Sequence, residues 1–171
     1  MIDDSLIGFS SGIVSLDELR KLPVYPSEER FLKGPVPIIE CVEEIPCNPC
    51  QTVCNRKAIR VGEPITNLPV LVDSEACSGC GQCVVVCPGL AIFIVDKTFS
   101  DTLATIMLPF EFLPLPSKGE AIIGINRAGK WICRGYVQEV QNRKSFDRTS
   151  VVTIAVPKEH ADEVRFFRIA P

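Results

Sequence analysis

Eight of the nine cysteines in this 171-residue chain lie between Cys41 and Cys87. Four of them follow the spacing Cys-x2-Cys-x2-Cys-x3-Cys, with a proline directly after the last, and these are Cys77, Cys80, Cys83 and Cys87. Cysteines at this spacing bind [4Fe–4S] clusters, with three thiolates on one cluster and the fourth on another. A tight loop can reach three iron corners of a cubane but not the fourth. The motif therefore predicts a second cluster and a second motif.

An irregular second motif lies upstream, with spacings of x5, x2 and x3 between its members Cys41, Cys47, Cys50 and Cys54. A shift of 33 residues superimposes its last three cysteines on the last three of the downstream motif. We interpret this as an internal repeat in which each unit contains a strand, a cysteine loop, a short helix and a strand. The same shift places Cys77 on Glu44, so the first upstream ligand has moved to Cys41.

We predict two [4Fe–4S] clusters that share ligands crosswise between the two motifs. The first cluster is assigned to Cys41, Cys47, Cys50 and Cys87, and the second to Cys77, Cys80, Cys83 and Cys54. Disulfides and structural zinc are the alternatives for the whole set, although zinc sites usually present two separated Cys-x2-Cys pairs. A [3Fe–4S] cluster is a further alternative for the first site, because Cys41 stands in an unusual place.

The elements that must position these cysteines indicate an α+β fold. We expect an N-terminal helical arm over residues 1–35, with helical signals at 15–22 and 26–34, and a pseudo-twofold two-cluster module over 36–100. Residues 101–171 predict a small antiparallel β domain, either a barrel or a sandwich, with a tight hairpin turn at 127–129 and a short helix at 157–163. Its expected strands are 103–112, 120–126, 130–140, 151–156 and 165–169.

Composition excludes several functional classes. The net charge of −3 argues against a nucleic-acid partner, and no apolar run is long enough to span a membrane. The acidic start lacks the features of a signal peptide, so we expect a cytoplasmic protein. No dinucleotide fingerprint, phosphate-binding loop or nucleophile elbow is present, so we assign no catalytic residue. His160 is expected on the surface, Cys133 as a buried structural thiol, and Trp131 and Phe146 in the core or against a partner.

The downstream motif resembles that of two-cluster bacterial ferredoxins. A longer pattern is similar to the small iron–sulfur proteins encoded beside FAD-dependent amino-acid dehydrogenases of anaerobic bacteria, whose flavoprotein subunits resemble sarcosine oxidase, hydrogen-cyanide synthase and hydroxyproline dehydrogenase. The segments that carry this resemblance are residues 34–36, 39–41, 45–50, 108–112 and 146–149. The resemblance implies that the chain assembles with a flavoprotein and takes its electrons from a reduced flavin.

These observations predict an electron-transfer subunit that is not catalytic alone. A flavin receives two electrons from an amino-acid or amine substrate, whereas clusters accept them one at a time, so two adjacent clusters can relay the pair to a downstream acceptor. One alternative is a freely diffusing ferredoxin that serves several oxidoreductases. The other is a non-redox assembly protein whose clusters only stabilise its fold.

Overall fold

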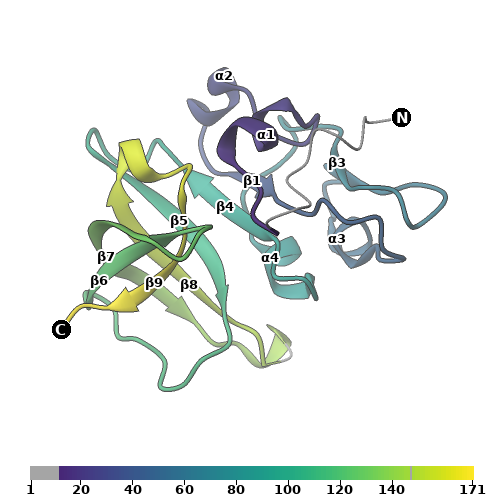
Figure 1. Ribbon diagram of the computed structural model, residues 1–171. Helices are drawn as coiled ribbons and strands as arrows, with labels where there is room; N and C mark the ends of the chain where they lie inside the picture. Colours follow the sequence, from purple (N-terminus) through teal and green to yellow (C-terminus); the bar gives the residue numbers. More distant parts are fainter. Residues whose placement is uncertain (1–11, 147) are drawn as a thin grey trace.

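The computed structural model describes residues 12–146 and 148–171, so residues 1–11 of the expected arm and Asp147 of the resemblance pattern lie outside the described residues. The chain is mixed α/β, with few helices and a mostly antiparallel β structure. Figure 1 shows a curled sheet on one side of the molecule, and the short helices and cysteine loops on the other.

The arm contains two short helices whose sequence signals are local. Helix α1 (Leu16–Lys21) begins at a capping box, in which the Ser15 hydroxyl accepts from the Glu18 amide and the Glu18 carboxylate accepts from the Ser15 amide. Helix α2 (Glu28–Phe31) begins at Ser27, whose hydroxyl accepts from the Arg30 amide. Both helices are too short to be stable alone, and their buried residues pack against the rest of the chain.

The cysteine region contains two similar units. The first runs β1 (Val36–Ile39), α3 (Pro49–Val53) and β2 (Ile59–Arg60), and the second runs β3 (Val70–Leu71), α4 (Gln82–Val86) and β4 (Ile92–Asp96). The outer strands pair with each other, β1 with β4, and the inner strands pair likewise, β2 with β3. Exchange of the two units leaves this pairing pattern unchanged, and α3 contacts α4 across it.

The remaining strands lie within two residues of the expected ranges. They are β5 (Leu103–Phe110), β6 (Ala121–Asn126), β7 (Trp131–Gln141), β8 (Ser150–Pro157) and β9 (Val164–Ile169). Two 3-10 helices follow β7 and β8, at Lys144–Phe146 and Lys158–His160, and the second is shorter than the helix expected at 157–163. The turn between β6 and β7 contains Gly129 at a φ of +75°, as a tight hairpin requires.

One seven-stranded antiparallel sheet joins the cysteine region to the C-terminal strands, in the order β1-β4-β5-β8-β7-β6-β9. It curls so that β9 returns to contact β5, where Phe110 and Phe167 stack with ring centroids 5.2 Å apart. The expected boundary at residue 100 falls in the turn between β4 and β5, and hydrogen bonding continues across it through pairs such as Val95 with Ile106. The sheet therefore fixes the cysteine loops against the C-terminal half.

Two apolar clusters fill the interior. One lies inside the curled sheet and includes Ile106, Ile122 and Ile154, all fully buried. The other lies under the cysteine loops, and joins Leu19 of the arm to Val84 of α4 and Ile92 of β4. The second cluster contains Cys50 and Cys83, so the cysteine helices are anchored in the same core that holds the arm.

Candidate functional site

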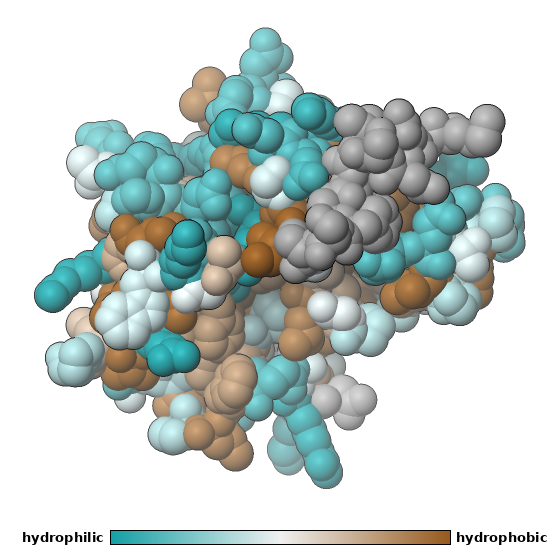
Figure 2. Space-filling view, in the orientation of Figure 1, coloured by the Kyte–Doolittle hydropathy of each residue, from teal (hydrophilic) through white to brown (hydrophobic). Residues whose placement is uncertain are grey.

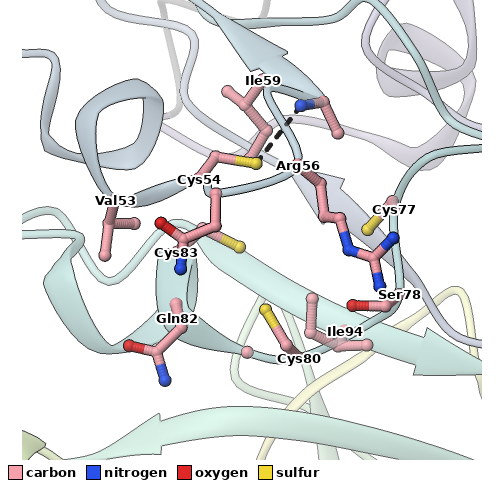
Figure 3. A pocket seen from close by; sticks show the side chains of 13 residues that line it. Val53, Cys54, Arg56, Ile59, Cys77, Ser78, Cys80, Gln82, Cys83 and Ile94 are labelled. Carbon is pink, nitrogen blue, oxygen red and sulfur yellow. Dashed lines mark hydrogen bonds between the residues drawn. The ribbon is translucent and has the colours of Figure 1, made fainter.

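Two cavities each gather four cysteines. The first, here called the Cys77 cavity, has a volume of about 280 Å³ and is lined by Cys54, Cys77, Cys80 and Cys83. Figure 3 shows these four sulfurs around the cavity, with Cys54 arriving from the upstream unit and the others from the loop before α4 and its first turn. The second, here called the Cys41 cavity, is narrower, about 30 Å³, and is lined by Cys41, Cys47, Cys50 and Cys87. Each cavity takes three cysteines from one unit and one from the other.

The backbone around the shared cysteines repeats at the 33-residue shift. Cys54 and Cys87 each directly follow a five-residue helix, and each has an extended backbone conformation. The Ala58 amide donates to Cys54 Sγ at 3.3 Å, and the Ala91 amide donates to Cys87 Sγ at 3.4 Å. Lys57 and Leu90, which precede these amides, have positive φ values of 54° and 52°. The two units therefore direct their last cysteine by the same local turn.

Burial makes the protein environment unfavourable for free thiolates. It raises the pKa of Cys83 to about 12, with the neighbouring Cys77 and Cys80 adding to the increase, and raises the pKa of Cys50 to about 11. The pKa values of Cys41 and Cys77 are also raised by burial. Thiols must lose their protons to bind iron, so bound iron would offset this cost.

The donor set fits a cluster better than it fits one ion. No group of three or more Cys, His, Asp or Glu side chains in residues 12–146 and 148–171 is placed to hold a single metal ion. In a cubane each thiolate binds a different iron, so the sulfurs surround a cavity and do not converge on one point. Eight soft thiolate ligands in two sets of four match the ligand requirement of two such clusters.

Glycines let the loop before α4 pass close to its neighbours. Gly79 has a φ of +67°, and a Cβ there would lie 2.5 Å from Cβ of Pro35. Its amide donates to Cys77 Sγ at 3.5 Å. Gly81 also has a positive φ, and a Cβ there would collide with Met107 Sδ of β5. The Cys77 loop is thus held between the arm and the sheet, and Gly79 brings its amide near the Cys77 sulfur.

Arg30 of α2 holds the same loop, and sequence reasoning missed it. Its guanidinium donates to the carbonyl oxygens of Ser74 at 2.7 Å, Gly34 at 3.1 Å, Pro35 at 3.0 Å and Cys77 at 3.0 Å. Only 4% of the residue is exposed. An arginine in a four-residue helix has no periodicity that would predict its burial.

Glu40, directly before Cys41, belongs to a second polar contact that sequence reasoning missed. Its carboxylate accepts from Arg127 of the β6–β7 turn at 2.6 Å and 2.9 Å, and from Arg165 of β9. All three side chains are largely buried. This contact attaches the start of the upstream cysteine loop to the far edge of the sheet.

The other residues singled out in the sequence, and two basic residues that follow Cys54, lie away from the sulfurs or on the surface. Cys133 lies on β7, is partly buried and lines neither cysteine cavity. Arg56 and Lys57 are exposed, and Arg56 reaches the rim of the Cys77 cavity (Figure 3). Phe146 is in the core, whereas Trp131 is 63% exposed and is not a core residue. His160 is partly exposed on its 3-10 helix.

Comparison with known protein families gives one match. The family of the 4Fe-4S binding domain, Fer4, matches residues 70–93, which span β3, α4 and the downstream cysteine motif. The chain carries a 4Fe-4S binding domain. No curated protein matches the chain, and no solved structure does. None of the helices in the described part of the chain is long and apolar enough to span a membrane.

Proposed function

We propose that the protein is an electron carrier that holds two [4Fe–4S] clusters in a pseudo-twofold module. Cys41, Cys47, Cys50 and Cys87 bind the first cluster, and Cys54, Cys77, Cys80 and Cys83 bind the second. The observation that carries this proposal is the division of the eight cysteines between two cavities, each with three sulfurs from one unit and one from the other. The matched 4Fe-4S binding domain supports the chemistry for the downstream motif.

The bound clusters supply one-electron redox chemistry, and the chain's own residues set the conditions for it. The amides of Ala58, Gly79 and Ala91 donate to cysteine sulfurs, which stabilises negative charge there. The apolar walls of the cavities, such as Ile59 and Ile94 at the Cys77 cavity, limit access of water. These contacts favour a defined cluster geometry and potential.

We further propose that the carrier works as the iron–sulfur subunit of a flavoprotein dehydrogenase for an amino acid or amine, within a hetero-oligomer in the cytoplasm. The resemblance of the longer sequence pattern supports this assignment. Exposed apolar side chains of the C-terminal half also support it, because Leu113 is 87% exposed, Trp131 63% and Phe112 62%. Figure 2 shows hydrophobic side chains at several places on one face, among hydrophilic ones.

The cluster content is tested by anaerobic purification of the full chain, followed by iron and acid-labile sulfide determination and by low-temperature EPR of the reduced protein. About eight irons and eight sulfides per chain, with two reducible signals, are expected for two cubanes. About four irons, or a [3Fe–4S] signal together with a [4Fe–4S] signal, would contradict the proposed content. Clusters that no reductant changes would favour a purely structural role.

The partner is tested by anaerobic pull-down of the tagged chain from its native host, with flavin counted in the eluate. A flavoprotein in stoichiometric amount, whose substrate bleaches the clusters, is the expected result. Elution of the chain alone with its clusters intact would overturn the subunit assignment and favour a freely diffusing ferredoxin. The iron count in the same eluate keeps the two questions separate.

A further inference from the structure

Arg30 is a buried cation whose partners are all neutral. Its guanidinium donates to four backbone carbonyl oxygens, and no carboxylate among residues 12–146 and 148–171 forms an ion pair with it. A buried charge is costly unless it is paired as well as hydrogen-bonded. Two further arginines with largely buried side chains, Arg127 and Arg165, do have a carboxylate, that of Glu40. Arg30 therefore lacks a counter-charge among the described side chains.

The position of Arg30 indicates where its counter-charge would be. Two of its acceptors, Ser74 and Cys77, belong to the downstream cysteine loop, and the other two, Gly34 and Pro35, belong to the arm. Cys77 is a proposed cluster ligand, and its thiolate would carry negative charge in the residue whose carbonyl Arg30 binds. Burial raises the pKa of the Cys77 thiol, and the positive charge of Arg30 acts in the opposite direction.

Among the described residues that line the Cys41 cavity there is one carboxylate, that of Glu43, and no arginine. Burial is the main cause of the raised pKa of Cys41, whereas the Glu43 carboxylate adds only a small increase, which the hydrogen bond from the Glu43 backbone opposes. Arg56 lines the Cys77 cavity, and Arg30 donates a hydrogen bond to the carbonyl oxygen of Cys77. Reduction adds one negative charge to a cluster, and a fixed positive charge nearby favours that form, most strongly where water is excluded.

We propose that Arg30 is a positioning residue for Cys77 and the fixed positive charge that makes the cluster at the Cys77 cavity the more easily reduced of the two. This inference rests on the proposed function, because it requires two clusters. Its consequence is directional: electron transfer from the cluster at the Cys41 cavity to the cluster at the Cys77 cavity is favoured over the reverse transfer. The N-terminal arm, through one side chain of α2, thereby sets the order of reduction.

The test is an EPR-monitored redox titration of the full chain with Arg30→Gln and Arg30→Lys. The control is Lys33→Gln, which removes a positive charge from the same arm in an exposed ion pair with Glu75. The signal that Cys80→Ser changes identifies the Cys77 cavity. We expect Arg30→Gln to shift this signal to a more negative potential and leave the other signal in place. Arg30→Lys keeps the charge and should shift it less, although lysine lacks the forked donor geometry.

Several results would overturn the inference. These are an unshifted potential in Arg30→Gln, equal shifts of both signals, or a shift in Lys33→Gln as large as that in Arg30→Gln. If Arg30→Gln loses half of its iron, Arg30→Lys decides between charge and geometry. Full iron in Arg30→Lys supports the positive charge as the required feature. The same loss of iron in both variants contradicts a role for the charge. Two reducible signals in the wild type keep the proposed function intact in each case, whereas a wild type without them overturns both.

Discussion

The two cysteine units have a similar backbone from their helix, α3 or α4, to the turn that follows it. The loops before these helices are attached to different parts of the molecule. Helices α3 and α4, the extended cysteine that ends each of them and the amide-to-sulfur bond that follows all recur at the 33-residue shift. These features fix the direction of Cys54 and Cys87, the two cysteines that reach across to the other cavity. The crossing point is thus the part of the site that the repeat preserves.

The first cysteine of each unit is held differently. Cys77 lies in a glycine-containing loop between Pro35 of the arm and Met107 of β5, and the Arg30 guanidinium binds its carbonyl. Cys41 follows Glu40, whose carboxylate is bound by two arginines of the curled sheet. One loop is therefore fixed through neutral carbonyls around a cation, and the other through a buried ion pair. The comparison teaches that two units with a similar final sulfur arrangement can hold their first cysteine by different anchors.

Cys54→Ser gives the largest effect and tests the crossing of ligands. Because Cys54 lines the Cys77 cavity, its loss should remove the cluster of the downstream cysteines and about half of the iron, with a large drop in stability. Iron determination and EPR measure the result. The matched control is Cys133→Ser, since Cys133 lines neither cavity and should leave the iron content unchanged. Loss of the signal assigned to Cys41 and retention of the other would contradict the crosswise arrangement.

Glu40→Gln tests the anchor of the upstream loop. The change leaves the buried Arg165 and Arg127 without their shared carboxylate, and such a loss costs about 3–5 kcal/mol of unfolding free energy. Chemical denaturation of the cluster-loaded protein measures it. Glu75→Gln is the control, because the Glu75–Lys33 pair is exposed and should contribute less than about 1 kcal/mol. Equal effects of the two changes would show that Glu40 is not an anchor.

Local sequence patterns predicted the parts of the molecule that local forces determine. The capping serines located α1 and α2, the alternating apolar residues located the C-terminal strands, and the cysteine spacing grouped the eight cysteines as the two cavities do. The 33-residue shift also anticipated the equal placement of α3 and α4. Each of these features depends on residues a few positions apart, or on a repeat that is visible in the chain itself.

The features that sequence reasoning missed are contacts between distant residues. Arg30 and Cys77 are separated by 47 positions in the sequence, and Glu40 and Arg165 by 125 positions. No spacing rule connects either pair. The continuity of the sheet was missed for a related reason. Strand β4 is apolar at four successive positions and buried at all four, a pattern of a central strand, but the pattern does not state which strand lies on its second side.

Gly79→Ala tests the close packing of the Cys77 loop on the arm. The new Cβ would lie 2.5 Å from Cβ of Pro35, a rigid ring, so the loop or the arm must move. Gly129→Ala is a matched control, because Gly129 also has a positive φ but has no atom within 4 Å of the added Cβ. We expect Gly79→Ala to cost about 1–3 kcal/mol more than the control in chemical denaturation, as overpacking does. A difference near zero would show that the arm does not confine this loop.

The smallest expected effect concerns the turn that both units share. Lys57 and Leu90 are exposed and have positive φ, which costs a side chain about 1–2 kcal/mol, whereas glycine adopts it freely. Glycine also loses more backbone entropy on folding, so Lys57→Gly and Leu90→Gly should each stabilise the protein by no more than about 1 kcal/mol. Arg56→Gly, at a residue without positive φ, should destabilise it by about 0.5–1 kcal/mol. Opposite signs for Lys57→Gly and Leu90→Gly would mean that the two turns, despite similar φ values, are not equivalent parts of one repeat.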